Sequence, residues 1–312
     1  MLNRRRFISQ SAFAAGALFT HSSLLNEMAN SASAYRLTIL HTNDVHSRID
    51  PFPMDGSRNQ GLGGVAARAD LIEKIRAEEQ HTLLLDAGDI FQGTPYFNLY
   101  KGEPEIKAMT AMKYEATTIG NHDFDAGLEN LATQLTNHAK FPMLVSNYDF
   151  TGTPMEYKYE PYRILKKGKI KIGVFGLGIE MTGLVPDNLS AGTKYIDPVQ
   201  VGNEMAAKLK HDKGCDFVIC LSHLGYQYRE KKVSDISLAG DTENIDLIIG
   251  GHTHTFLNAP VTKKNKKSDD VIINQVGFAG INLGRIDYDF SRISKKKITN
   301  YQSITITKKI AE

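Results

Sequence analysis

The sequence predicts an α/β protein built as one large domain, with more β structure toward its carboxyl end. Up to about residue 250, short apolar or β-branched runs alternate with stretches whose apolar residues recur at helical spacing. From Pro260 onward the chain contains only short β-like runs. No repeat, low-complexity linker or shift in composition divides it. We therefore expect one α/β domain that includes a second, more antiparallel sheet.

The first part of the chain is expected to alternate strands and helices. The pattern is clear in residues 63–79, because Val65, Ala69, Ile72 and Ile75 recur at helical spacing with charged residues on the other side. The expected strands are residues 35–40, 82–85, 116–119 and 141–146, and the expected helices are residues 63–79, 103–112 and 128–138.

The second part of the chain is expected to begin with a hairpin, residues 164–177, that turns at Lys167-Gly168. After it we expect helices at residues 199–211 and 231–238, and strands at residues 217–222, 245–249, 271–276, 281–290 and 298–306. The two cysteines, Cys215 and Cys220, are separated by a strand-like run that keeps them too far apart for a disulfide. Both are expected to be structural thiols.

The composition is typical of a globular protein. Of the 312 residues, 41% are hydrophobic and 23% are charged, and the net charge is +2. This balance does not suggest a protein that binds nucleic acid. Lysine-rich stretches at residues 263–267 and 295–297 interrupt strand-like runs. We interpret them as solvated turns or as protection of sheet edges, and a patch for an anionic partner is the alternative.

Residues 1–34 are similar to an export signal. Arg4-Arg5 followed by Phe7-Ile8 resembles a twin-arginine signal, and residues 32–34 (Ala-Ser-Ala) offer a cleavage site. The apolar stretch between them, residues 13–19, is too short to span a bilayer. The alternatives are a general secretory signal and a disordered tail. A signal would place the mature protein, from about Tyr35, in the periplasm or outside the cell.

Polar residues of one chemical kind follow five of the expected strands. They occur as H-T-N-D-V-H at residues 41–46, D-A-G-D at 86–89, G-N-H-D-F-D at 120–125, L-S-H at 221–223 and G-G-H-T-H at 250–254. The carboxyl ends of strands in an α/β sheet meet at one rim, so these side chains are expected to converge. Each motif alone also has a structural explanation, such as a capped turn or a helix start. Five of them in order predict a metal site.

The spacing within two of these motifs suits shared ligation. Asp44 and His46 lie two residues apart, which on an extended strand end directs both side chains to the same side. His252 and His254 have the same spacing and follow two glycines, which let the backbone approach the site without a Cβ atom. Asp44 and His46 could therefore bind one cation together.

The types of side chain indicate the class of metal. Asp89, which follows a glycine, can bridge two cations with its two carboxylate oxygens, and Asn121 offers a neutral amide oxygen. Imidazole and carboxylate ligands without a thiolate suit Mn, Zn, Fe or Co better than Ca or Mg.

The motifs resemble those of the calcineurin-like metallophosphoesterases, and more closely those of the 5′-nucleotidase / UDP-sugar hydrolase family. The resemblance rests on H-T-N-D-x-H, L-D-A-G-D, G-N-H-D-F-D, L-S-H-L-G and I-I-G-G-H-T-H-T, and it runs from about Leu37 to the end of the chain. It implies a four-layer α/β/β/α sandwich of two mixed sheets, with two divalent metals between them.

The resemblance also implies a role for each matching residue. His122 would be the catalytic histidine, and Asp125 the carboxylate that orients it. Asp123 stands where many members of the family have glutamate, and we interpret it as a replaceable structural residue, for example a cap for the helix after it. The implied ligands are Asp44, His46, Asp89 and His254 for one metal, and Asp89 (bridging), Asn121, His223 and His252 for the other.

The charges of such a site favour phosphate ester hydrolysis. Two divalent metals would bring four positive charges, and Asp44, Asp89 and a bridging hydroxide would bring three negative ones, so a phosphate anion is attracted. The metals lower the pKa of bound water, and the bridging hydroxide would attack the phosphorus in line. His122, kept charged by Asp125, would act as a further donor. We expect hydrolysis of a phosphate monoester of a nucleotide-like small molecule.

The family pattern usually continues into a second, substrate-binding domain, which we do not find before Glu312. Residues 35–312 would then be the catalytic domain, with either an open, permissive site or a separate substrate-binding subunit. Two other functions stay open. One is the same site acting on a cyclic phosphodiester, a nucleotide sugar or a sulfur ester, and the other is a metal-bearing binding subunit without activity.

Overall fold

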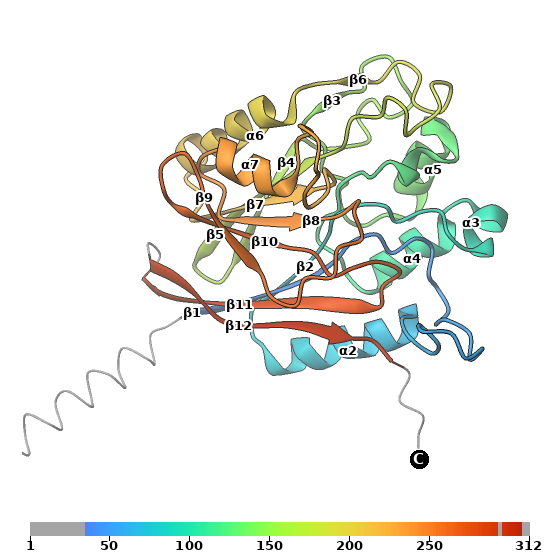
Figure 1. Ribbon diagram of the computed structural model, residues 1–312, viewed down its shortest axis with the longest axis horizontal. Coiled ribbons are helices and arrows are strands. Elements are labelled where there is room, and N and C mark those ends of the chain that lie inside the picture. Colours follow the sequence, from blue (N-terminus) through green and yellow to red (C-terminus); the bar gives the residue numbers. More distant parts are fainter. Residues whose placement is uncertain (1–34, 293–294, 308–312) are drawn as a thin grey trace, which may run out of the picture.

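Two β-sheets form the framework of the protein in a computed structural model that describes residues 35–292 and 295–307 (Figure 1). The first sheet has the strand order β12 (Lys295–Thr305), β11 (Asn282–Arg292), β1 (Tyr35–Thr42) and β2 (Thr82–Asp86). The second has the order β4 (Tyr162–Lys167), β5 (Ile170–Leu177), β7 (Phe217–Ser222), β8 (Leu247–Gly250), β10 (Asp270–Asn274) and β9 (Val261–Lys264). A short pair, β3 (Tyr148–Asp149) and β6 (Lys194–Tyr195), stands apart from them. The export signal predicted for residues 1–34 lies outside the described residues.

Both sheets are mixed. In the first, β1 pairs in parallel with β2 and antiparallel with β11. In the second, β5, β7, β8 and β10 are parallel neighbours, and antiparallel strands close both edges. The predicted pair of mixed sheets is therefore confirmed.

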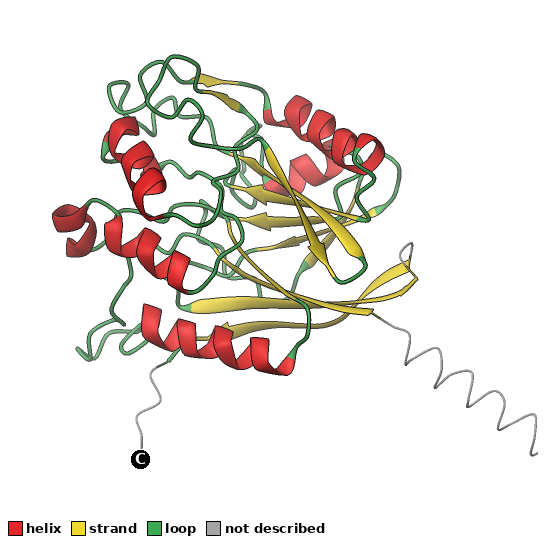
Figure 2. Cartoon of the chain, turned by 180° about the vertical axis from the view of Figure 1, so that it is seen from behind, coloured by secondary structure: helices red, strands yellow, loops and turns green. Residues whose placement is uncertain are grey.

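Helices cover the outer face of each sheet, which gives the four layers that were expected (Figure 2). The helices on the side of the first sheet are α2 (Val65–Glu78), α3 (Pro95–Tyr100), α4 (Glu103–Ala111), the short 3₁₀ turn η1 (His122–Phe124) and α5 (Gly127–His138). The helices on the side of the second sheet are α6 (Pro198–Ala207), its π-helical continuation η2 (Lys208–Asp212) and α7 (Asp235–Asp241).

Alternate residues of the central strands serve two different hydrophobic layers. On β7, Phe217, Ile219 and Leu221 pack between the two sheets, whereas Val218 and Cys220 pack toward α6 and α7. Parallel strands that are covered on both faces need apolar residues at every position, which explains the unbroken apolar sequence of β7. Cys215 and Cys220 are both buried and free, as expected.

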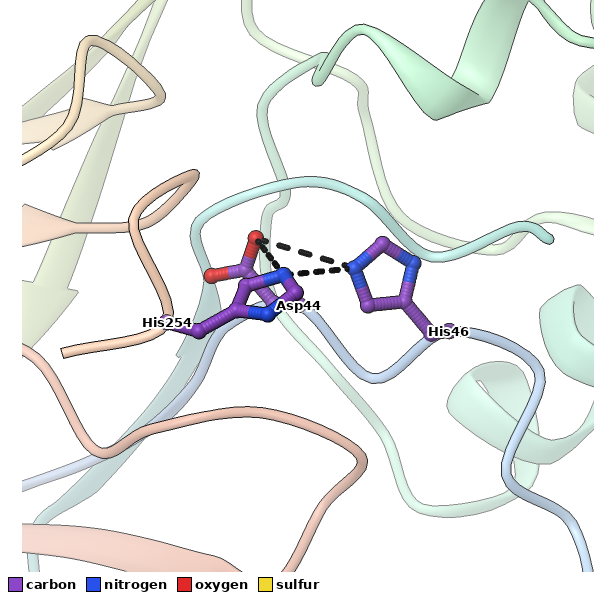
Figure 3. Close-up of side chains that lie close together, drawn as sticks. All are labelled: Asp44, His46 and His254. Carbon is purple, nitrogen blue, oxygen red and sulfur yellow. Dashed lines mark hydrogen bonds and ion pairs between the residues drawn. The ribbon is translucent and has the colours of Figure 1, made fainter. Parts of the chain in front are cut away.

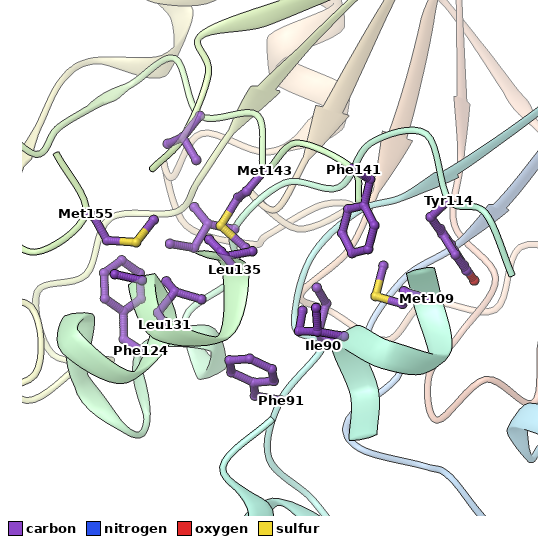
Figure 4. Packing of buried hydrophobic residues seen from close by; sticks show 14 of the residues in the cluster. Ile90, Phe91, Met109, Tyr114, Phe124, Leu131, Leu135, Phe141, Met143 and Met155 are labelled. Atoms are coloured by element: carbon purple, nitrogen blue, oxygen red, sulfur yellow. The ribbon is translucent and has the colours of Figure 1, made fainter. Parts of the chain in front are cut away.

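A further hydrophobic cluster fixes the segment that contains His122 (Figure 4). Phe124, at the end of η1, is fully buried beside Leu131 of α5 and Met155. Its ring also meets that of Tyr148 edge to face, with centroids 6.0 Å apart. The turn that carries His122 is therefore anchored in the core by its third residue.

Two of the predicted strands are much shorter than expected. Residues 116–119 and 141–146 form only isolated bridges, of Ala116 with Leu85, of Thr117 with Met143 and of residue 144 with residue 160. The side chains of two threonines form hydrogen bonds in this region. Thr117 Oγ1 donates to Asp86 Oδ1, and Thr118 Oγ1 donates to the carbonyl oxygen of residue 144. Side-chain bonds of this kind compete with a regular ladder.

The helix predictions are correct in place but not in every boundary. The helix expected at residues 231–238 begins only at Asp235, because Ser234 and Ser237 form a capping box there. The short helix α3 was not predicted. Lys263 and Lys264 lie on β9, and residues 295–297 on β12, which are edge strands of their sheets, in agreement with a role in protecting those edges.

The packing of the hydrophobic layer between the sheets leads to a prediction about a core substitution. Phe217 is fully buried there and packs against the rings of Tyr288 and Phe290, at 4.9 and 6.0 Å between centroids. Phe217→Ala is expected to lower the free energy of unfolding by about 3–5 kcal/mol, measured by urea denaturation. Tyr301→Ala, at an aromatic residue with 46% exposure on β12, is the control and should cost less than about 1 kcal/mol. Equal effects of the two substitutions would contradict this account of the core.

Candidate metal centre

The polar clusters converge where strands of both sheets end. Two groups of side chains offer ligand atoms that all lie within 4.8 Å of one another. The groups are Asp44, His46 and His254, and Asp89, His223 and His252. Asp44 and Asp89 follow strands β1 and β2 of the first sheet, whereas His223, His252 and His254 follow strands β7 and β8 of the second.

The first group points its ring nitrogens and one carboxylate at a common space (Figure 3). His46 Nε2 and His254 Nε2 lie 2.9 Å apart. Asp44 Oδ1 lies 3.5 Å from His254 Nε2 and 3.9 Å from His46 Nε2. Three ligand atoms of this kind fit one divalent cation.

The second group shares a carboxylate with the first. Asp89 Oδ2 lies 3.1 Å from His223 Nε2, and it is also 3.8 Å from His46 Nε2 in the first group. Asn121 Oδ1 completes the second group, because it lies 2.8 Å from His252 Nδ1. The Asp89 carboxylate therefore lies within 4 Å of an imidazole nitrogen in each group.

Backbone carbonyl groups orient two of the imidazoles. His46 Nδ1 lies 3.2 Å from the carbonyl oxygen of Phe91, and His223 Nδ1 lies 2.7 Å from that of Ala87. With the proton on Nδ1, Nε2 is free to bind a cation. His223 Nε2 is buried and has no hydrogen-bond partner among the described residues, although the Asp89 carboxylate is close. A metal ion would satisfy this atom, so the site fits the group that its residues imply.

The pKa values of this region reflect the burial of its carboxylates and imidazoles. Asp44 and Asp89 are fully buried, and burial raises the pKa of Asp44 to about 8. Although burial alone lowers it, the Asp89 and Asp44 carboxylates raise the pKa of His223 to about 10. Burial lowers the pKa of His252 to about 3 and that of His254 to about 4, which keeps both rings neutral with a free electron pair. Neutral imidazoles beside buried carboxylates are suited to divalent cations.

The sequence had suggested that the candidate ligands reach the site from extended backbone. In the structure they do not. Their φ angles are 51° at Asp44, 49° at His46, 54° at Asp89, 72° at His252 and 52° at His254. These values lie in the left-handed region, which residues other than glycine adopt rarely and mainly where the surroundings enforce it. The two-residue spacing correctly indicated that Asp44 and His46 share one group, whereas His252 and His254 fall into different groups. The explanation from strand alternation was wrong for both pairs.

Two glycines make room for these ligands. A Cβ atom on Gly120 would lie 2.1 Å from Asp89 Oδ1, and one on Gly251 would lie 2.9 Å from His223 Nδ1. Gly120 is therefore required by close approach to a carboxylate rather than by a tight turn.

His122 and Asp125 form a pair beside the two groups of ligand atoms. His122 Nδ1 lies 2.8 Å from Asp125 Oδ2, and this contact raises the pKa of His122. The backbone N–H of His122 donates to Asp89 Oδ1 at 2.8 Å, and its ring meets that of His46 at 5.3 Å. The His122 side chain is 40% exposed, so a substrate can reach it.

Asp123 is not the replaceable residue that the sequence suggested. It is buried, and its carboxylate accepts hydrogen bonds of 2.8–3.2 Å from four backbone N–H groups. The donors are the N–H groups of Asp89, Ile90, Phe91 and Gly120. It does not cap α5, which begins at Gly127 after Ala126. Asp123 instead fixes the loop that presents Asp89. Successive N–H groups in a turn form such anion-binding hollows.

None of the helices in residues 35–292 and 295–307 has the length and the apolar character needed to cross a bilayer.

Comparison with known proteins agrees with the geometry of the site. Residues 37–256 match the family described as calcineurin-like phosphoesterase. The chain is 38% identical to the snake venom 5′-nucleotidase of Crotalus adamanteus over 72% of its own length and 38% of that protein. It is 36% identical to the 5′-nucleotidase of Vibrio cholerae, over 88% of this chain and 52% of that protein.

A solved structure has the same fold. The 5′-nucleotidase precursor from Thermus thermophilus matches with a TM-score of 0.76 and 29% identity, over 88% of this chain and 55% of that one. The chain thus spans about half or less of the length of these proteins.

The contacts of Asp123 predict a large effect of its removal. Asp123→Ala leaves four buried N–H groups without their acceptor, so the metal-free protein should lose about 2 kcal/mol or more of its free energy of unfolding. Urea denaturation measures the loss. The control is Asp187→Ala at an exposed aspartate. If Asp123→Ala were as stable as this control, the carboxylate would not hold the Asp89 loop.

Proposed function

This chain belongs to the calcineurin-like phosphoesterase family, and on that premise we propose that it hydrolyses phosphate monoesters of nucleotide-like substrates with two divalent metal ions. The observation that carries the proposal is the pair of ligand groups joined by Asp89, with His122 and Asp125 beside them. The names of the related 5′-nucleotidases support a nucleotide as substrate.

Each metal would be held by side chains from both sheets. Asp44, His46 and His254 would bind one ion, and Asn121, His223 and His252 the other, with Asp89 shared between them. When bound, divalent metals activate water as a nucleophile and neutralise negative charge on a phosphate group. Imidazole and carboxylate ligands without a thiolate support Mn, Zn, Fe or Co as the metal.

The His122–Asp125 pair would supply the proton for the leaving group. Asp125 accepts the Nδ1 proton of His122, which leaves Nε2 as the atom that holds and donates the second proton. In its charged form the ring also attracts the phosphate oxygens. The buried turn η1 keeps the ring beside the ligand groups, because Phe124 is anchored in the core. These are the tasks of a general acid and of an electrostatic donor.

We propose residues 35–312 as the catalytic domain and residues 1–34 as a twin-arginine export signal. The pattern of Arg4-Arg5 and Phe7-Ile8 supports the signal. A relative whose name places it in snake venom supports a location outside the cytoplasm, such as the periplasm.

The role of His122 has a direct test. His122→Ala should lower kcat by about 10²–10⁴-fold while the protein keeps both metal ions, because the imidazole acts on the substrate rather than on the metals. Kinetics and elemental analysis of the same preparation decide this. His211→Ala, at an exposed histidine of η2, is the matched control and should behave as wild type. Loss of one metal equivalent in His122→Ala would make His122 a ligand instead.

Removal of the metals tests the proposed reaction. The chelated, metal-free protein should show no turnover, and Mn²⁺ or Zn²⁺ should restore it, because the nucleophile depends on the metals. The reloaded protein is then offered AMP, a cyclic nucleotide, a UDP-sugar and an aryl phosphate.

The pattern of substrates distinguishes the alternatives. Turnover of AMP supports a nucleotidase, and turnover of the aryl phosphate alone indicates an open, permissive site. A preference for the cyclic nucleotide or the UDP-sugar would mean that the site hydrolyses a phosphodiester or a nucleotide sugar instead. No turnover after metal loading would leave only a subunit that needs a separate partner, or a binding module.

A further inference from the structure

A buried glutamine next to the site uses every hydrogen-bonding position of its side chain. Gln275 is fully buried and lies immediately after β10. Its Nε2 donates to the carbonyl oxygen of Gly251 at 2.8 Å and to Asp235 Oδ2 at 3.0 Å. Its Oε1 accepts from the backbone N–H of Thr255 at 3.1 Å and from Thr253 Oγ1 at 3.3 Å. An amide has two donor and two acceptor positions, so its capacity is filled.

These bonds enclose the loop that carries two proposed ligands. Gly251 and Thr255, which bind the Gln275 amide through their backbones, flank His252 and His254. Both histidines have left-handed backbone, which a free loop would not favour. The glutamine therefore holds the loop on both sides of its strained part.

The glutamine is itself fixed to the strand that leads to another ligand. Asp235, the first residue of α7, is fully buried and accepts from Ser222 Oγ at 2.6 Å. Ser222 ends β7 and directly precedes His223. Hydrogen bonds between side chains therefore connect Gln275 to Asp235, and Asp235 to Ser222.

The segment that begins with Gln275 also binds the loop of Asp44. The backbone N–H of Val276 donates to Asn43 Oδ1 at 3.0 Å, and that of Ala279 donates to the carbonyl oxygen of Asp44 at 2.7 Å. Between them, Phe278 stacks on the His254 ring, with centroids 5.0 Å apart and an angle of 13°. Residues 275–279 therefore contact ligand loops from both sheets.

We infer that Gln275 is a positioning residue for both metal ions. It fixes one loop, but that loop places His254 in the first ligand group and His252 in the second. Loss of the amide should loosen both sites together. This inference rests on the proposal that these histidines bind metals, and it adds a residue that none of the sequence motifs contains.

The test measures metal binding rather than activity. Metal-free wild type and Gln275→Met are titrated with Zn²⁺ or Mn²⁺ by calorimetry, because methionine fills a similar volume without the hydrogen bonds. The affinity of Gln275→Met should be about 10–100-fold weaker at both sites, as is typical when a residue that supports ligands is lost. An affinity within about twofold of wild type at both sites would overturn the inference.

A matched control separates positioning from general loss of stability. Asn265 is a buried amide in the turn between β9 and β10, where its Oδ1 accepts from the backbone N–H groups of Lys267 and Asp269 at 2.8 and 2.9 Å. Asn265→Ala should lower Tm without changing metal affinity. If it weakened metal binding as much as Gln275→Met, the effect would be one of stability and the inference would be wrong.

An exchange of partners provides the second test. Gln275→Glu sets a carboxylate against that of Asp235 and should weaken metal binding strongly. Adding Asp235→Asn restores a hydrogen bond between the two side chains, so the double variant should recover part of the affinity. If Gln275→Met does not fold, the comparison of Gln275→Glu with the double variant tests the inference in its place. Equal losses of metal affinity in the single and double variants would overturn it. A wild type that binds no metal would instead overturn the proposed function itself.

Discussion

The site depends on one electrostatic constraint, the burial of two carboxylates within reach of the same imidazoles. Asp44 and Asp89 are both excluded from solvent, and Asp123 adds a third buried carboxylate that binds the loop of Asp89. Buried negative charges are costly unless cations or N–H donors compensate them. The backbone N–H groups of His122 and His252, which donate to Asp89 and Asp44, supply part of that compensation. Two divalent ions would supply the remainder, so metal binding and stability of the rim are linked.

The fold divides the candidate ligands between its two sheets. The first sheet presents the carboxylates of Asp44 and Asp89, and the second presents the imidazoles of His223, His252 and His254. Neither sheet alone could bind two cations. Only the packed sandwich, with residues 275–279 in contact with loops of both sheets, brings charge and counter-charge together. The hydrophobic layer between the sheets is thus also what aligns the metal centre.

Features that depend on periodicity and motif spacing could be predicted from the sequence, but features that depend on tertiary contacts could not. The strand β7 and the ligand-type residues after it could be identified, because an apolar run and motif spacing are local properties. The left-handed backbone at Asp44 and His254 could not, since no periodic pattern encodes it. The short bridges near Thr117 depend on side-chain bonds to Asp86. Gln275 and Asp123 belong to the site only through distant partners, so their roles could not be recognised in one sequence.

The position of β1 in the first sheet sets the order in which the protein can assemble. β1 lies between β2 and β11, and Thr38 Oγ1 donates to Asp287 Oδ1 across 249 residues of sequence. During synthesis, the strand that leads to Asp44 therefore lacks its second neighbour until β11 has left the ribosome. Contacts of such long range fold slowly and leave a strand edge exposed meanwhile. The candidate metal centre, which includes Asp44 directly after β1, is consequently expected to form only after β11 has been made.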